Sequence, residues 1–195
     1  MIDLYTWHTP NGRKVSIMLE EIGMTYNVIP INIAKDEQFQ PHFLEFSPNN
    51  RIPAIVDKEN NNYSLFESGA ILMYLAEKSG KLINKSNSDE YYRTIEWLMW
   101  QMGGVGPMFG QVHHFVKYNK GKSAYAEERY SKEARRLYGV MDKRLGQHQY
   151  ISGKEYSIAD ISIWPWTARF DWQEIDLSEY KNVTRWYKEM ADRPA

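Results

Sequence analysis

The sequence predicts a mixed α/β domain followed by an all-helical domain, and three observations support this fold class. Strand and helix patterns alternate through about the first 80 residues, strand patterns then stop, and only helical spacing follows. A polar stretch between the two regions, KLINKSNSDE at residues 81–90, is typical of a linker. We therefore expect an α/β domain at residues 1–80 and a helical domain at residues 87–195.

The first elements are predicted to be a strand, a helix and a second strand. IDLYTW at residues 2–7 predicts the first strand. The helix over residues 12–23 is indicated by an apolar face of Val15, Met18, Leu19 and Ile22. In TYNVIPINI, Ile29, Ile31 and Ile33 alternate with other residues, which predicts the second strand. Since Pro30 has no N–H to donate to a ladder, this strand belongs at a sheet edge.

The rest of the α/β domain is predicted to be a helix, a hairpin and a second helix. Phenylalanines recur through residues 36–46 and indicate a loose helix. PAIVD and YSLFE, separated by KENNN, predict a β-hairpin. ESGAILMYLAEKSG predicts a helix that ends at Gly80. A βαβ unit has parallel strands and a hairpin has antiparallel ones, so the domain should contain a small mixed sheet.

The second domain carries helical spacing in residues 130–145 and 183–190. Ser157 and Asp160 fit a helix capping box. GGVGPMFG lacks the GK[ST] of a phosphate-binding loop and is expected to let two helices or a partner subunit approach closely, with Pro107 bending the chain. The tryptophans at 97–100 are typical of a core or dimer interface. Adjacent His113 and His114 would make a poor metal chelate.

Composition excludes several classes of protein. The 195 residues are 43% hydrophobic, with a net charge of -1. This balance favours a folded core and does not favour a nucleic-acid or anionic-membrane partner. No apolar run approaches the roughly 18 residues of a membrane span, and MIDLYTW is unlike a signal peptide. There are no cysteines, which removes disulfides, thiolate metal sites and a cysteine nucleophile of the protein's own. We expect a cytoplasmic protein.

The stretch RIPAIVDKENNNYSLFESGAI, residues 51–71, suggests a binding site for the zwitterionic end of an amino acid. A cis bond before Pro53 would turn the backbone of Ile52 outward, toward an extended peptide. Ser68 at a helix N-terminus suits a carboxylate, and Glu67 suits an ammonium group. The alternative is structural: Pro53 starts a strand and Ser68 caps a helix.

A second candidate segment is TPNGRK at residues 9–14, between the first strand and the first helix. Ligands of open α/β sheets bind at the carboxyl ends of strands. The hydroxyl of Thr9 and the amide of Asn11 could hold a thiolate beside the helix N-terminus. Alternatively, both are ordinary turn and cap residues, and Pro10 helps to start the helix.

Nearly the whole chain resembles a cytosolic glutathione S-transferase, with a thioredoxin-like N-terminal domain and a helical C-terminal domain. RIPAIVD, FESGAI and YSIADISIWPW carry this resemblance. TPNGRK, SPNNRIPAIVD, SLFESGAILMYLAEKSG, WLMWQMGGVGPMFGQVHHF and AEERYSKEARRLY are more narrowly similar to the nu class, the bacterial branch of glutathione-dependent disulfide-bond oxidoreductases. In such relatives the chain usually continues past the ADRPA at which this sequence stops.

The resemblance implies a set of glutathione contacts. The backbone of Ile52, beside a cis Pro53, would hold the cysteinyl part, and Glu67 and Ser68 would hold the γ-glutamyl end. Thr9 and Asn11 would meet the sulfur as the catalytic pair, where other classes use Tyr, Ser or Cys. The implied set also includes Gln38, Arg51 and Arg129. Arg129 would reach a carboxylate, either in the site of its own subunit or in that of the partner subunit. Trp7 and His8 fit no pattern.

The resemblance also implies an activity. A glutathione thiolate would attack a small disulfide, and a second glutathione would resolve the mixed disulfide, so that no protein cysteine or metal is needed. The protein would be a homodimer that binds glutathione and small-molecule disulfides. Two alternatives stay open: a transferase that joins glutathione to small electrophiles, and a non-catalytic glutathione-binding regulator.

Overall fold

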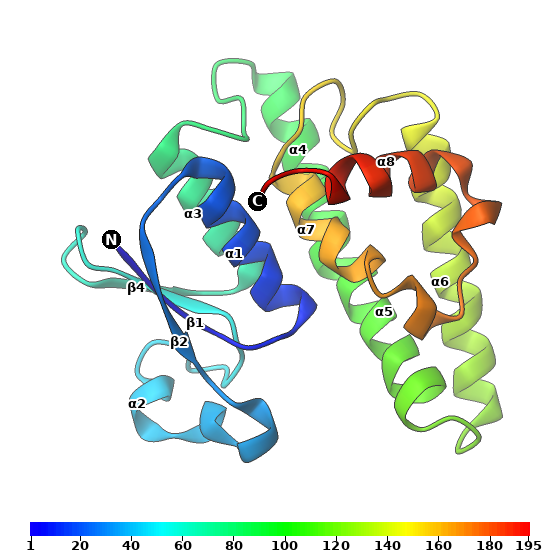
Figure 1. Ribbon diagram of the computed structural model, residues 1–195, viewed down its shortest axis with the longest axis horizontal. Coiled ribbons are helices and arrows are strands. Elements are labelled where there is room, and N and C mark those ends of the chain that lie inside the picture. Colours follow the sequence, from blue (N-terminus) through cyan, green and yellow to red (C-terminus); the bar gives the residue numbers. More distant parts are fainter. The chain divides into compact units, whose positions relative to one another are not determined.

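The computed structural model describes residues 1–195, which divide into two units. The first contains Met1–Ile83 together with Ala195, and the second contains Asn84–Pro194. The first unit is a mixed α/β structure and the second is helical, so the predicted fold class is confirmed (Figure 1). No helix combines the length and the apolar character needed to cross a membrane.

The first unit is built on a four-stranded sheet in the order β2-β1-β3-β4. The strands are β1 (Ile2–Thr6), β2 (Tyr26–Pro30), β3 (Ala54–Asp57) and β4 (Tyr63–Phe66). β1 pairs in parallel with β2 and antiparallel with β3, and β3 pairs antiparallel with β4. The mixed sheet, the hairpin and the edge position of the proline-containing strand are as the sequence predicts.

Helices cover both faces of this sheet. α1 (Pro10–Ile22) and α3 (Ser68–Ser79) pack against each other, and Figure 1 shows the strands between them and α2 (Pro41–Leu44). Alternation along β1 explains the division. Leu4 is fully buried, whereas its neighbour Tyr5 points to the other face and packs against Phe43 and Phe46 around α2.

Two predicted elements of this unit are wrong in extent. The second strand ends at Pro30, because Asn32 caps a 3-10 turn, Ile33–Lys35, by accepting a hydrogen bond from the Ala34 N–H at 3.0 Å. The single helix expected over residues 36–46 is a 3-10 turn, Glu37–Phe39, followed by the short α2. Gln40 separates them in an extended conformation, as a residue before a proline prefers.

The second unit contains five α-helices. The first of them begins at Ser88, inside the polar stretch 81–90 that the sequence indicated as a linker. They are α4 (Ser88–Trp100), α5 (Gly106–Val112), α6 (Ala124–Leu145), α7 (Ile158–Thr167) and α8 (Lys181–Ala191). π-helical turns at Gln101–Val105 and His113–Tyr118 flank α5, and 3-10 turns at Phe170–Gln173 and Leu177–Glu179 lie between α7 and α8. The core includes a stacked pair, Phe109 and Tyr138, with ring centroids 5.0 Å apart.

The glycine-rich run makes room for a tryptophan of α7. A Cβ atom at Gly106 would lie 2.7 Å from the Gln101 Nε2 atom and 3.5 Å from the Trp166 Nε1 atom. One at Gly110, a turn later, would lie 3.5 Å from the Trp166 ring. The expected close approach of two helices is therefore confirmed, between α5 and α7.

The adjacent histidines have separate environments. His113 is buried, stacks on Trp166 and shares a 3.2 Å hydrogen bond with Gln173, and burial lowers its pKa to about 4. His114 lies on the surface side of the same turn and packs on Phe115. His113 therefore belongs to the packing of the helices.

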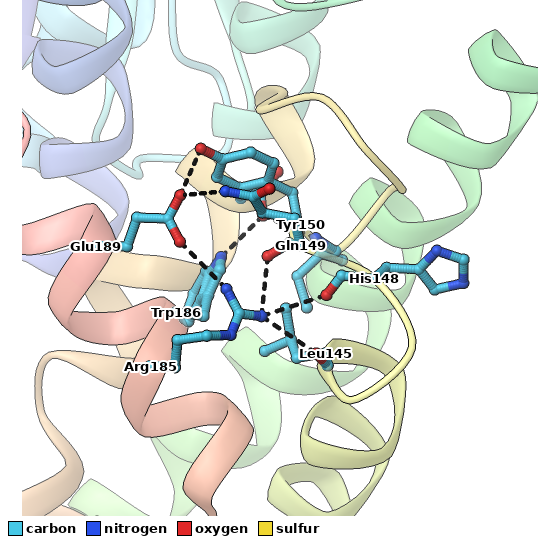
Figure 2. Close-up of polar contacts among 9 residues, drawn as sticks. Leu145, His148, Gln149, Tyr150, Arg185, Trp186 and Glu189 are labelled. Atoms are coloured by element: carbon cyan, nitrogen blue, oxygen red, sulfur yellow. Dashed lines mark hydrogen bonds and ion pairs between the residues drawn. The ribbon is translucent and has the colours of Figure 1, made fainter.

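Arg185 of α8 joins the end of α6 to the loop that follows (Figure 2). Its guanidinium donates to the carbonyl oxygens of Leu145, His148 and Gln149 at 3.1, 3.2 and 3.1 Å. It also pairs with Glu189 at 3.1 Å. The last carbonyl groups of a helix have no hydrogen-bond partner within the helix. A cationic side chain that donates hydrogen bonds to them therefore stabilises the helix end.

The predicted capping box at the start of α7 is confirmed, and it extends further than the sequence indicates. Asp160 is fully buried and accepts hydrogen bonds from the backbone N–H and hydroxyl of Ser157. It also accepts from the Ile151 N–H and the Trp186 Nε1–H, both at 2.9 Å. One carboxylate therefore ties together α7, α8 and the preceding loop.

The replacement Asp160→Asn should destabilise the protein by about 3 kcal/mol or more, because an amide cannot accept at both positions and leaves buried donors without a partner. Urea denaturation of both proteins measures this difference. Asp176→Asn is the matched control, since Asp176 caps an exposed turn by accepting from Ser178 at 2.8 Å. We expect the control to lose about 1 kcal/mol or less. Equal losses in both variants would contradict the role given to Asp160.

Candidate functional site

The register of the sheet brings four loops to one edge, which is the edge formed by the ends of the strands and not the side of an outer strand. β1 and β2 are parallel and end at Thr6 and Pro30, which are paired. β3 runs the opposite way and begins at Ala54, which pairs with Tyr5 of β1 and with Phe66 of β4. The chain segments that follow β1, β2 and β4, and the segment that precedes β3, therefore meet at this edge. They contain residues 7–9, 31–39, 67–68 and 51–53.

Thr9 occupies the N-cap of α1. Its hydroxyl oxygen accepts a hydrogen bond from the Gly12 N–H at 3.2 Å, and its carbonyl accepts from the Arg13 N–H at 3.0 Å. Because the oxygen is the acceptor in the cap, the hydroxyl hydrogen can point outward as a donor. Asn11 lies in the same first turn and is half-buried, as Thr9 is. The structural and the ligand-binding interpretations of Thr9 are therefore compatible.

Gly12 holds the start of α1 against the end of β1. A Cβ atom at this position would lie 2.4 Å from both the Thr6 Oγ1 atom and the Trp7 carbonyl oxygen. Only a glycine allows this approach, which sets the place of Thr9 relative to the sheet edge. In the sequence, the Asn-Gly pair in TPNGRK is the signal for this close approach.

Trp7 and His8 form part of the turn into α1. Their rings lie 5.2 Å apart, and the Trp7 carbonyl oxygen accepts from the Thr9 N–H at 2.7 Å. This bond shapes the turn that presents Thr9.

The Ile52–Pro53 peptide bond is cis, the isomer that the resemblance implies. The backbone before it is held by Ser47, a fully buried residue whose hydroxyl donates to the Arg51 carbonyl oxygen at 2.7 Å. The Arg51 side chain is exposed. This segment lies opposite the end of β4, because Ala54 and Phe66 are paired.

Glu67 and Ser68 form the junction between β4 and α3. Glu67 has a left-handed φ of 70°, which is uncommon for a residue other than glycine, asparagine or aspartate. It sits at the N-cap of α3, and its side chain makes no capping hydrogen bond. Ser68 is thus the first residue of α3 rather than its cap. A helix N-terminus without a capping side chain offers its N–H groups to an anion.

Lys14 lies under this junction and was not singled out by the sequence analysis. Its side chain is 1% exposed, and its ammonium donates to the Ser68 hydroxyl at 3.2 Å. Burial lowers its pKa to about 7, against an opposing effect of the Glu67 charge. The signal was its spacing, since Lys14, Met18 and Ile22 are four residues apart on the buried face of α1.

Gln38 is 7% exposed and faces inward from the Glu37–Phe39 turn. Its Nε2–H donates to an Asp36 carboxylate oxygen at 3.4 Å, while its buried Oε1 atom has no hydrogen-bond partner. A buried acceptor without a partner is costly, so a rotation of this amide toward a ligand donor would be favourable.

Arg129 belongs to the second unit, whereas the other expected contact residues belong to the first. It is exposed on α6 and lines a surface cavity of about 670 Å³. The cavity is lined by Met108, Tyr125, Glu128, Arg129, Tyr130, Lys132, Glu133 and Arg136.

The arrangement at the sheet edge can stabilise anions at two places. The N-terminus of α1, with Thr9 and Asn11, is suited to a thiolate, and the N-terminus of α3, with Ser68 and Lys14, is suited to a carboxylate. No group of three or more histidine, aspartate or glutamate side chains is placed to hold a metal ion. The fold and site define a thioredoxin-like ligand-binding domain joined to a helical domain.

The chain belongs to the glutathione S-transferase family. Residues 1–77 match the family's N-terminal domain, and residues 104–194 match its C-terminal domain. It is 48% identical over 199 residues to the disulfide-bond oxidoreductase YfcG of Escherichia coli (strain K12), an alignment that covers 100% of this chain and 92% of that protein.

Solved structures of family members have the same fold. One from Pseudomonas fluorescens, with two glutathione bound, superposes with a TM-score of 0.93 at 45% identity, covering 99% of this chain and 89% of that one. One from Pseudomonas putida, with one glutathione disulfide bound per subunit, gives a TM-score of 0.92 at 44% identity and covers 99% and 87%.

Gly12→Ala should lower the free energy of unfolding by about 1–3 kcal/mol, because the added methyl group collides with β1 and forces α1 to move. Chemical denaturation measures the change. Gly139→Ala on α6 is the matched control, since nothing lies within 4 Å of a Cβ atom there. Alanine in that helix should instead stabilise by about 0.5–1 kcal/mol. A Gly12 variant as stable as the wild type would show that the close approach is not needed.

Proposed function

We propose that this protein is a glutathione-dependent disulfide-bond oxidoreductase of the nu class, which reduces small disulfides on bound glutathione. The observation that carries the proposal is the meeting of Thr9 and the N-terminus of α1 with the Ile52–Pro53 and Glu67–Ser68 segments at one sheet edge. The 48% identity to the disulfide-bond oxidoreductase YfcG supports the choice of reaction.

Glutathione would bind along this edge in an extended conformation. Its cysteinyl backbone would pair with the backbone of Ile52, and its γ-glutamyl end would lie against Glu67 and Ser68. Gln38 and Arg51 would contact the remaining polar groups, with Arg51 near the glycyl carboxylate. The sulfur would then lie by Thr9 and Asn11. The solved relatives with glutathione or glutathione disulfide bound support this ligand.

The chemistry would take place on the ligand, since the 195 residues contain no cysteine. A thiol has a pKa near 8.5, and the Thr9 hydroxyl, the Asn11 amide and the helix N-terminus would all favour its anion. The glutathione thiolate attacks one sulfur of the substrate disulfide, which forms a mixed disulfide and releases a thiolate. A second glutathione thiolate attacks the glutathione sulfur of that intermediate, which forms glutathione disulfide and releases the second substrate thiol.

We also propose that the protein acts as a homodimer in the cytoplasm, where glutathione is kept reduced. Tyr92 and Met99 are 67% and 47% exposed and seven residues apart on α4, so one helix face offers apolar surface to a second copy. Arg129 would reach a carboxylate of glutathione in the partner subunit's site.

Replacing Thr9 with Val should lower kcat/KM for disulfide reduction by about 10²-fold, the usual cost of losing one donor to a reacting anion. The assay is reduction of 2-hydroxyethyl disulfide by glutathione, coupled to NADPH through glutathione reductase. The acidic limb of the pH profile should move to higher pH, because the bound thiol loses a donor. Asn11→Ala should likewise lower kcat/KM and move the acidic limb of the pH profile to higher pH.

Two variants serve as controls for this experiment. Thr9→Ser keeps the hydroxyl and should keep most of the activity, whereas Thr25→Val removes an exposed hydroxyl from the same domain and should change nothing. A chlorodinitrobenzene conjugation assay runs beside the disulfide assay. Fast conjugation with slow disulfide turnover would favour an ordinary transferase, and glutathione binding without either activity would favour a regulator.

Mixing two inactive dimers tests the role of Arg129. If Arg129 acts in the partner's site, then a dimer of one Arg129→Ala and one Thr9→Val subunit contains one intact site, and mixing should restore activity. If Arg129 acts within its own subunit, then both sites of the mixed dimer are defective and activity stays low. Arg135→Ala, an exposed position on the same helix, is the control and should leave activity unchanged.

A further inference from the structure

The surface cavity that Arg129 lines is larger than a single contact to a carboxylate requires. Its volume is about 670 Å³, which lies within the range of cavities that hold a whole small molecule. Met108 of α5 forms one side of it, and the other lining residues come from α6. A glutathione carboxylate at Arg129 would therefore leave room in the cavity for a second chemical group.

Part of the cavity wall is apolar and aromatic. It consists of Met108, Tyr125 and Tyr130. Tyr130 is half-buried and stacks on Phe115, with ring centroids 5.5 Å apart, so its ring is held against the packed helices. Tyr125 is 74% exposed and offers an accessible ring. A wall of this kind suits the carbon chain or ring of a ligand.

The charged side chains of the cavity do not balance one another. Three are cations and two are carboxylates. Arg136 and Glu133 are paired, since the Arg136 guanidinium donates two hydrogen bonds of 2.7 Å to that carboxylate. The other three, Arg129, Lys132 and Glu128, make no ion pair. One positive charge is left over, which favours an anionic group in the cavity.

Lys132 is the neighbour of Arg129 on the exposed face of α6. The two positions are three residues apart, which places their Cβ atoms about 5–6 Å from each other. In the proposed reaction one half of the substrate becomes joined to glutathione through a disulfide bond. That half stays close to the glutathione whose carboxylate Arg129 would hold, so the charge of Lys132 acts on it.

We propose that this cavity receives the half of the substrate disulfide that becomes joined to glutathione, and that Lys132 makes disulfides with a carboxylate better substrates than neutral or cationic ones. This inference rests on the proposed function, because it concerns the substrate of the same reaction. It adds a specificity-determining residue outside the set that the family resemblance implies.

The test compares three disulfides with the same two-carbon arms and different end groups: dithiodipropionate is anionic, 2-hydroxyethyl disulfide is neutral and cystamine is cationic. For each, kcat/KM in the glutathione reductase-coupled assay is divided by the rate constant of its uncatalysed reaction with glutathione. The wild type should rank the anionic disulfide first and the cationic one last. Lys132→Met should lower the anionic-to-neutral ratio about fivefold, the upper end of the effect of one exposed charge at close range.

Two further variants change the charge of the cavity in opposite directions. Lys132→Glu should lower the anionic-to-neutral ratio about 25-fold, the square of the single-charge effect, and make cystamine the better substrate. Glu128→Gln removes a carboxylate one turn away and should raise the ratio about threefold. These shifts should shrink at high salt, because screening weakens interactions between exposed charges.

Lys143→Met is the matched control, since it removes an exposed lysine about 16 Å further along α6 and should keep the ratio of the wild type. Glutathione is the reductant in all three assays, so an effect of a variant on glutathione binding cancels in the ratio. Equal ratios in the wild type, Lys132→Met and Lys132→Glu, with every disulfide reduced, would overturn the role of Lys132 and leave the proposed function standing. An equal shift in Lys143→Met would also overturn it, because any lysine of the helix would then suffice. A wild type that reduces none of the three disulfides would overturn both proposals.

Discussion

The pairing of β1 with a parallel strand on one side and an antiparallel strand on the other is the constraint on which the candidate site depends. Because β3 runs against β1, the loop that enters β3 meets the loops that leave β1 and β2 at one edge of the sheet. The hairpin register then places the start of α3 at the same edge. Gly12 brings the start of α1 against it. Two helix N-termini therefore face one edge, and this is the geometry of a site for a ligand with several negative groups.

Two deeply buried charged residues, Asp160 and Lys14, have opposite environments. Asp160 receives donors from Ser157, Ile151 and Trp186, so its burial joins three segments and contributes to the fold. Lys14 lies beside a helix N-terminus, where a cation is disfavoured. Its pKa in the folded protein, about 7, is below the 10.5 of an exposed lysine, so the unfolded chain binds more protons between these values. The free energy of unfolding therefore rises with pH over that interval, and a charged Lys14 costs stability.

A chain without cysteine cannot supply the thiol, so its contribution to the proposed reaction is orientation and electrostatic stabilisation of anions. Several residues of the candidate site also have a role in folding. Thr9 caps α1 with its oxygen and has its hydrogen to donate, and Ser47 fixes the backbone of Arg51 next to the cis bond at Pro53. Such shared roles explain why structural and functional interpretations of these residues could not be separated by spacing.

The sequence by itself determined the mixed and helical units, the edge strand with its proline, the hairpin, the capping box at Ser157 and the family. These features depend on residues a few positions apart, whose periodicity and capping are visible in the chain. Only the tertiary structure decided that residues 36–46 break into short turns, that Gly12 touches β1, and that Lys14 reaches Ser68, which is 54 positions away. Contacts of that kind depend on strand register and helix packing, and no local pattern of residues encodes the partner that a buried side chain will meet.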